Sequence, residues 1–307
     1  MPAAYAHITL VNELSEPNVL EGINGFSDEA IPAVLTHFKY CELGAVSPDL
    51  PYLALMDSDA AKWADKMHYE STCSMISVGA EKVRNLSGSS RDKALAWLLG
   101  YAAHVAMDVT IHPVVELKVG PYHGNEMAHR KCEMNQDAYI FDRLNLGGIG
   151  LSEHLDSGIG ACKASGGGLD PVIRDLWDSI LEEVHPAEYQ NNKPDIDKWF
   201  KSFVAVVDNF AEEGNKLIPL ARHVAAGKAL VYPNRDEVDD TYITGLSTPS
   251  GSMNFDDIFD RAVFNVGSMW ASVSKSVIDH DATELAAMGT WNLDTGRDEA
   301  GSLVYWS

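Results

Sequence analysis

Apolar residues recur along most of this chain at steps of three and four, the spacing of a helix with one buried face. The clearest example runs through residues 91–112, with an apolar stripe made of Ala94, Trp97, Leu98, Tyr101 and Val105. Similar stripes run through residues 57–85, 171–184, 194–211 and 254–277. No convincing run alternates with the period of two that marks a strand. The pattern therefore predicts an all-α protein.

Capping residues mark where several of these helices begin. The predicted starts are Ser27, Asn125, Asp170 with Pro171 behind it, and Asn254, all of types that accept hydrogen bonds from the first helical N–H groups. The stretches without helical spacing are residues 144–168, residues 231–253 and the tail after Ala287. No linker divides the chain, so we expect one multi-helix domain over residues 1–307.

Composition narrows the class of protein. Hydrophobic residues make up 46% of the chain, enough for a substantial core, and no run approaches the ~18 uninterrupted apolar residues of a membrane span. The N-terminus lacks the basic start and apolar segment of a secretory signal, which favours a cytoplasmic protein without integral membrane association. Four widely spaced cysteines are expected to be reduced core thiols, namely Cys41, Cys73, Cys132 and Cys162.

The chain is strongly acidic, with a formal net charge of −22 from 23 basic and 45 acidic residues. Such a surface repels phosphate backbones and anionic lipids at long range. Nucleic acid is therefore not an expected partner. Three bound divalent ions would change the charge only to about −16, so most of the acidic excess is solvated surface.

Histidines stand four residues before an acid at four places: His104/Asp108, His112/Glu116, His129/Glu133 and His280/Glu284. About 1.6 such matches are expected by chance from this composition. The pair His104/Asp108 stands out because it continues the apolar stripe of its helix. A buried carboxylate needs a partner, which is either a metal ion or a hydrogen-bonded histidine. His129/Glu133 offers a second helical pair, since positions four apart share a helix face.

Three more residues join the candidate set. His7 follows a short N-terminal segment, Asp49 lies in a Pro-Asp-Leu-Pro turn, and His68 lies on a predicted helix. Each has an ordinary structural interpretation, as a packed, turn-forming or surface residue. Together with the helical pairs they form a set of imidazoles and carboxylates without thiolates. That is the ligand chemistry of catalytic zinc, or of non-haem iron and manganese.

The order of these residues resembles the zinc-dependent phospholipase C family, which is related to the P1 and S1 nucleases. The resemblance covers roughly residues 1–140 and is strongest over 98–133. It implies a single all-helical domain that holds two to three zinc ions. It assigns Asp49, His68, His104 and Asp108 to a first zinc ion, His112, His129 and Glu133 to a second, and His7 with Asp108 to a third. It also makes Asp49 the candidate general base, although a carboxylate bound to metal is a poor base.

The chain departs from the secreted members of the family at two places. His112 lies four residues after Asp108 rather than six, and Pro113 behind it disfavours helix at this point. The expected ligand is therefore His112 or, if the proline turns His112 off the stripe, His123 as the fallback. The secreted enzymes also bind zinc through an N-terminal Trp, which is missing here. Removal of Met1 would leave a prolyl amine five residues before His7.

These residues predict hydrolysis of a phosphoester, because clustered divalent ions lower the pKa of a bound water from 15.7 toward ~7 and clamp a phosphoryl group. The expected substrate is a small phosphoester or a phospholipid head group. A P1-like nuclease or phosphatase is one alternative. Another is a di-iron oxidase or oxygenase built on Glu126-x-x-His129 and Glu182-x-x-His185. A non-catalytic helical binding protein is the third.

Overall fold

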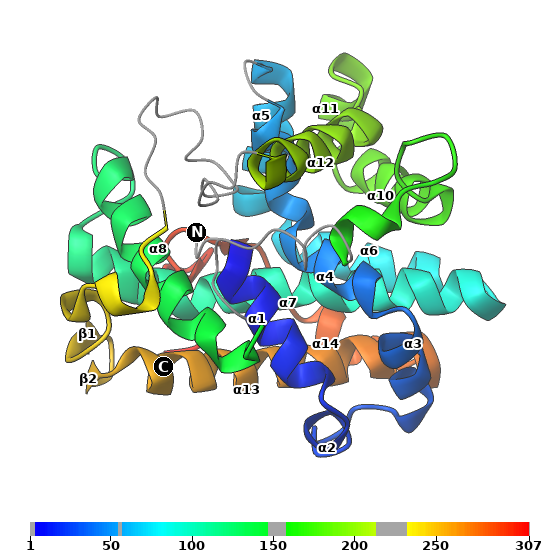
Figure 1. The fold of residues 1–307 in the computed structure, drawn as a ribbon. Helices are drawn as coiled ribbons and strands as arrows, with labels where there is room; N and C mark the ends of the chain where they lie inside the picture. The colour runs from blue at the N-terminus through cyan, green and yellow to red at the C-terminus, as the bar shows by residue number, and fades with distance from the viewer. Residues whose placement is uncertain (1–3, 55–56, 147–157, 213–231, 307) are drawn as a thin grey trace.

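The computed structural model describes residues 4–54, 57–146, 158–212 and 232–306, and these residues are mainly helical (Figure 1). The α-helices are α1 (Ala4–Ser15), α2 (Pro17–Leu20), α3 (Ile31–Thr36), α4 (Phe38–Val46), α5 (Ser58–Tyr69), α6 (Thr72–Arg84), α7 (Gly88–Val119), α8 (Glu126–Phe141), α10 (Pro171–Val184), α11 (Pro186–Asn191), α12 (Ile196–Glu212), α13 (Phe255–Ser274) and α14 (Thr283–Ala286). The predicted all-α class is confirmed. One domain over residues 1–307 stays a prediction.

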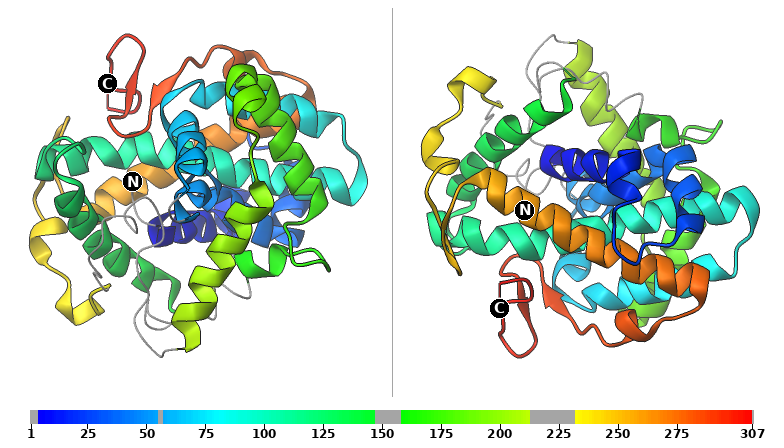
Figure 2. Two further views of the ribbon diagram at one scale, coloured as in Figure 1. Left: turned by 90° about the horizontal axis from the view of Figure 1, so that it is seen from above. Right: turned by 90° about the horizontal axis from the view of Figure 1, so that it is seen from below.

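Helix α7 is the longest described helix, and α4 and α13 pack along it (Figures 1 and 2). Two glycines allow α4 and α7 to touch through their backbones. A Cβ atom on Gly44 would lie 2.0 Å from the Trp97 carbonyl oxygen, and one on Gly100 would lie 1.9 Å from that of Cys41. Any side chain at either position would separate the two helices. This close crossing carries the Ala45 carbonyl to the His104 ring.

By length and composition alone, α7 could cross a membrane, which the sequence analysis did not anticipate. Its most apolar 18-residue window is 100% buried inside the protein. The other helices pack against this window, so burial within the protein accounts for the apolar composition of α7.

Several predicted helix starts are confirmed. The Asp170 side chain accepts a hydrogen bond from the Val172 N–H, and Asn254 forms a capping box with Asp257. Asn125 is the residue before α8. The residues after Ser27 first form a short 3-10 helix, Asp28–Ala30, and the predicted segment 57–85 is split into α5 and α6 at Ser71, which has a left-handed φ of 52°.

Helix α7 does not end at Pro113 as the sequence predicted. A proline inside a helix lacks the N–H that would bond the carbonyl four residues earlier, here that of Val109. Gly296, with a left-handed φ of 64°, packs against this point. A Cβ atom there would lie 2.5 Å from both the Val109 oxygen and Pro113 Cγ. Trp306 Nε1 donates to the Thr110 carbonyl at 2.8 Å, so the C-terminal segment supports α7 where the proline weakens it.

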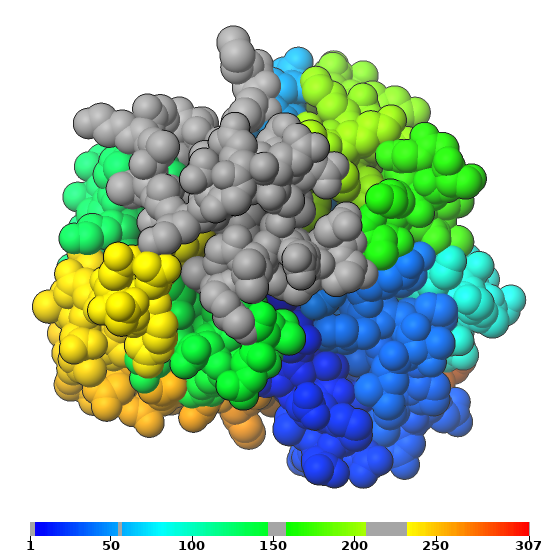
Figure 3. Space-filling model, in the orientation of Figure 1, coloured from blue at the N-terminus to red at the C-terminus, as the bar shows by residue number. Residues whose placement is uncertain are grey.

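Short strands lie in two stretches that showed no period-two pattern. Strands β1 (Leu246–Thr248) and β2 (Gly251–Met253) pair antiparallel, with Leu246 opposite Met253, and β3 (Trp291–Asn292) pairs with β4 (Arg297–Asp298), with Trp291 opposite Asp298. Strands of two or three residues are too short to show alternation. In Figure 3 the segment that includes β1 and β2, in yellow, and the N-terminal helices, in blue, lie at opposite sides of one face.

Candidate metal centre

Five of the predicted site residues converge from four elements. His7 lies on α1, Asp49 in a 3-10 helix (Ser47–Leu53), His68 in the last turn of α5, and His104 and Asp108 on α7. None of the five is more than 3% exposed. Two compact groups result, His7 with His104 and Asp108, and Asp49 with His68 and His104. In each group the candidate ligand atoms lie within 4.8 Å of one another.

The two groups meet at His104. Its Nε2 atom lies 3.3 Å from Asp108 Oδ2 and 3.4 Å from His68 Nε2. The other Asp108 oxygen, Oδ1, lies 3.2 Å from His7 Nε2. His68 Nε2 lies 3.3 Å from Asp49 Oδ1, and the rings of His7 and His104 stack 4.2 Å apart. Polar atoms of residues as far apart in the sequence as His7 and Asp108 therefore face one small volume.

The remaining three predicted residues extend this arrangement toward α8. His112 stays in α7 and is buried, with Nε2 3.9 Å from Asp108 Oδ1, so Pro113 does not turn it off the stripe. On α8, His129 Nδ1 lies 3.7 Å from Glu133 Oε1. Burial lowers the pKa of His112 to about 4, although the charges of Asp108 and Glu133 act in the opposite direction. Glu133 is thus close enough to His112 to act on its charge.

Backbone carbonyls fix the orientation of four of these imidazoles. Nδ1 of His68 lies 2.7 Å from the Ala64 oxygen and that of His104 lies 2.9 Å from the Ala45 oxygen, while Nδ1 of His112 bonds the Leu293 oxygen. His129 uses Nε2 instead, at 2.6 Å from the Gly120 oxygen. A carbonyl can only accept, so each of these nitrogens is the protonated donor. In the neutral form of each ring the other nitrogen then carries the lone pair, as in metal-ligating histidines.

The eight predicted ligands are called the cluster below. Many of their buried polar atoms have no hydrogen-bond partner among the described residues. They are His7 Nε2, both carboxylate oxygens of Asp49 and of Asp108, His112 Nε2 and His129 Nδ1. Buried polar atoms are normally bonded, and leaving one without a partner costs about 1–3 kcal/mol. Imidazole and carboxylate atoms that converge in this way fit the donor set of a catalytic zinc site.

Comparison with known proteins agrees with this chemistry. A family model described as zinc dependent phospholipase C matches residues 6–187, more than half of the chain. The chain belongs to the zinc-dependent phospholipase C family. All eight predicted ligands lie inside the matched range. No curated protein and no solved structure matches the chain.

Membership of the zinc-dependent phospholipase C family, together with the buried cluster, supports a hydrolase with zinc as its cofactor. The structure also bears on the di-iron alternative drawn from the sequence. In the di-iron hypothesis Glu182 and His185 would share a buried site with Glu126 and His129. Glu182 is instead exposed, and His185 caps the end of α10 beside the Trp63 ring.

Charge in the cluster follows from its mixed composition. Burial alone would raise the pKa of Asp108, but His104 and His112 hold it well below its usual value. Burial lowers the pKa of His104, but the negative charges of Asp108 and Asp49 outweigh this effect. The pKa of His104 is therefore raised. A buried acid elsewhere behaves in the opposite way: burial raises the pKa of Glu42 to about 7 against one opposing bond from Asn12. The lowered pKa values of Asp108 and Asp49 therefore keep these two carboxylates charged.

One residue that supports the site was missed by the sequence analysis. Asp137 on α8 is fully buried and accepts from the backbone N–H groups of Tyr5 at 3.1 Å and Ala6 at 3.0 Å, and from the Tyr232 hydroxyl at 3.0 Å. It thereby anchors the start of α1, the helix that carries His7. The signal in the sequence was the spacing of Asp137, four residues after Glu133 on the same helix face.

Other candidates lie apart from the cluster. His123, the fallback ligand, is exposed. His280 and Glu284 are exposed as well, and His280 has a left-handed φ of 60°. The predicted N-terminal amine lies outside the described residues.

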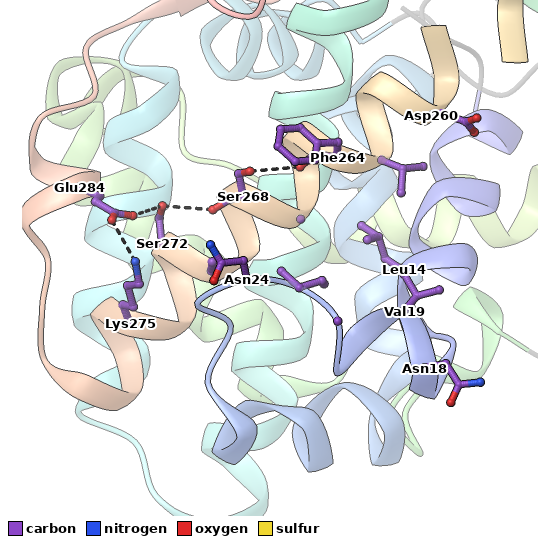
Figure 4. Close-up of a pocket in the computed structure, with 15 residues that line it drawn as sticks. Leu14, Asn18, Val19, Asn24, Asp260, Phe264, Ser268, Ser272, Lys275 and Glu284 are labelled. Atoms are coloured by element: carbon purple, nitrogen blue, oxygen red, sulfur yellow. Dashed lines mark hydrogen bonds and ion pairs between the residues drawn. The ribbon is translucent and has the colours of Figure 1, made fainter. Parts of the chain in front are cut away.

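A cavity of about 630 Å³ also lies away from the cluster, between α13 and the segment that follows α1 (Figure 4). Its lining is largely apolar and includes Leu14, Val19 and Phe264. At one end Glu284 accepts from Ser272 and pairs with Lys275. None of the eight predicted ligands lines this cavity.

Proposed function

We propose that this member of the zinc-dependent phospholipase C family holds two to three zinc ions in the buried cluster and hydrolyses a small phosphoester or a phospholipid head group. One observation carries the proposal: seven buried nitrogen and oxygen atoms of predicted ligands have no hydrogen-bond partners among the described residues, and those of His7, Asp49 and Asp108 converge on His104. A cluster that only packed would leave these groups desolvated at a high energetic cost.

The proposed ligand groups follow the distances. Asp49, His68, His104 and Asp108 would hold one ion, since three of them already form a group within 4.8 Å. His7 and Asp108 would hold another, with Asp108 Oδ1 facing His7 and Oδ2 facing His104. For the third ion, His112, His129 and Glu133 are proposed from the family resemblance rather than from distances. Asp108 would then be shared, which explains why both of its oxygens face imidazoles.

Zinc ions, when bound, supply Lewis-acid stabilisation of a phosphoryl group and lower the pKa of a water molecule. The protein contributes fixed geometry and charge. The carbonyl-anchored imidazoles present one lone pair each, and the buried carboxylates offset the positive charge. Asp49 is the proposed proton acceptor, because Oδ1 faces His68 and neither carboxylate oxygen has a hydrogen-bond partner among the described residues.

The substrate class follows from the charge of the whole protein. A net charge of −22 disfavours long anionic polymers and anionic bilayers. We therefore propose a small soluble phosphoester or a dispersed zwitterionic phospholipid as the substrate. Cytoplasmic location stays a prediction.

The experiment compares two histidine variants for hydrolysis of p-nitrophenyl phosphocholine by the zinc-loaded protein. His104→Ala removes the imidazole that belongs to both ligand groups. It should lower kcat/KM at least about 100-fold, the scale for removing one group that stabilises a transition state, and should release at least one zinc ion. His123→Ala removes an exposed imidazole nearby in the sequence and should retain both activity and zinc.

Full activity and full zinc content in His104→Ala would overturn the proposal. A parallel assay with a single-stranded polynucleotide tests the nuclease alternative. Faster cleavage of the polynucleotide than of the phosphocholine ester would replace the proposed substrate class, while leaving the metal centre in place.

A further inference from the structure

The C-terminal segment Trp291–Trp306 lies more than 100 residues beyond the family-matched range, yet it contacts the helices that carry the cluster. Strand β3 begins with Trp291, and a turn from Leu293 to Gly296 leads into β4. Strand β3 packs against α5 and α6, and the turn packs against α7 at Pro113.

A single peptide residue in this turn touches two predicted ligands. The Leu293 N–H donates to the His68 carbonyl oxygen at 3.0 Å, and the Leu293 carbonyl accepts from His112 Nδ1. Leu293 is fully buried. Its backbone therefore joins the end of α5 to the imidazole of α7 within the core, with water excluded from both bonds.

Neighbouring bonds hold Leu293 in this place. The Thr72 hydroxyl accepts from the Trp291 N–H and donates to the Trp291 carbonyl, both at 2.9 Å. The Tyr69 hydroxyl donates to Asp294 Oδ2 at 2.7 Å. On the far side of the turn, Gly296 fits against Val109 and Pro113 only because it lacks a Cβ atom.

We propose that the turn Leu293–Gly296 is a positioning element of the metal centre, which holds His112 with Nδ1 protonated and Nε2 directed toward Asp108. This inference rests on the proposed zinc function. Without the Leu293 carbonyl, His112 can rotate or carry its proton on Nε2, and a protonated nitrogen cannot bind a metal ion. Removing such an outer partner of a metal ligand typically costs about 10–100-fold in metal affinity.

Two glycine substitutions separate this role from a general effect on the backbone. Gly296→Ala adds a methyl group that collides with Val109 and Pro113 and displaces the turn. Gly301→Ala places the same residue at a similar left-handed φ of 80°, where no atom of the described residues beyond its chain neighbours lies within 4 Å of the added Cβ. In competition with a chromophoric chelator, Gly296→Ala should bind at least one zinc ion about 10-fold or more weakly. Gly301→Ala should match the unmodified protein.

A second pair of variants serves if Gly296→Ala does not fold. Thr72→Val removes both bonds to Trp291 and should weaken zinc binding in the same direction. Thr72→Ser keeps the hydroxyl and should restore it. Neither Thr72 nor Gly296 is a predicted ligand.

The histidine tautomer gives a readout that a purely structural role would not change. The protein is labelled with ¹⁵N-histidine and freed of metal with a chelator. The His112 resonances are assigned by their absence in His112→Gln, and they should report a proton on Nδ1. In Gly296→Ala and Thr72→Val that signature should weaken.

Unchanged zinc affinity and an unchanged His112 tautomer in folded Gly296→Ala and Thr72→Val would overturn the positioning role. The proposed function would still stand if His104→Ala loses zinc. If the unmodified protein binds no zinc, the proposed function fails. The tautomer measurement then still decides whether Leu293 fixes His112.

Discussion

Two regions of this protein contain the same sequence pattern, a histidine four residues before an acid, and only one of them forms a cluster. In α7, His104 and Asp108 are fully buried, and both Asp108 oxygens face histidines without forming hydrogen bonds among the described residues. Beyond α13, His280 and Glu284, which lies on α14, are exposed, and Glu284 bonds Ser272 at 2.5 Å and Lys275 at 3.0 Å.

The difference shows that spacing does not mark a metal site. Burial together with unsatisfied donor atoms does, because only a buried group without a partner gains much from an added ion. Glu284 already has its partners and faces water at the edge of the apolar cavity in Figure 4.

The sharpest test of this comparison replaces one acid in each region by its amide. Asp108→Asn removes the charge that faces His7, His104 and His112, so we expect zinc content to fall and kcat/KM to drop by about 10³-fold. Glu284→Gln should change neither and should alter stability by less than about 0.5 kcal/mol, as for other exposed pairs. Metal analysis and steady-state kinetics measure both. If Asp108→Asn and Glu284→Gln changed zinc content and kcat/KM equally, the proposed difference between the two regions would be wrong.

The anchor of α1 should contribute to stability outside the proposed ligands. Asp137→Ala leaves the N–H groups of Tyr5 and Ala6 buried without their acceptor, which we expect to lower the free energy of unfolding by about 3 kcal/mol. Asp137→Asn keeps one acceptor oxygen and should cost less. Denaturant titration measures both values. An unaffected Asp137→Ala would show that α1 is held by other contacts.

Metal removal should destabilise the folded protein, because zinc binds the folded and not the unfolded chain. At free zinc 100-fold above Kd, the linkage amounts to about 2.7 kcal/mol per site, or several degrees in Tm for a protein of this size. The same chelator should have little effect on Asp108→Asn. A Tm of the unmodified protein that does not respond to chelator would contradict the account of the cluster.

Glu42 offers a test of pH dependence at an acid outside the cluster. Its pKa of about 7 exceeds the ordinary 4.5, so the folded state binds the proton more tightly and stability falls as pH rises from about 4.5 to 7. Glu42→Gln should lack this fall. In chelator, the stability of the variant relative to the unmodified protein should therefore rise over that range, as measured by urea unfolding at several pH values. A constant difference would place the pKa of Glu42 near its ordinary value.

Much of the fold followed from the sequence, because helical stripes and capping residues are local signals. The placing of His104 and Asp108 on a buried face also followed, from a stripe that continued into polar residues, whereas the assignment of His68 to the same site came from the resemblance to the phospholipase C family. The support from Leu293 did not, since a backbone carbonyl can belong to any residue and leaves no sequence signal. Pro113 misled for a related reason: the C-terminal segment that supports the helix there lies almost 200 residues away in the chain.

The most direct measurement is the metal content of the purified, unmodified protein, by elemental analysis without added metal. The account predicts zinc at two to three equivalents per chain, and removal of that zinc should be accompanied by loss of phosphoester hydrolysis that added zinc restores. Protein that folds and hydrolyses phosphoesters with no stoichiometric metal would contradict it.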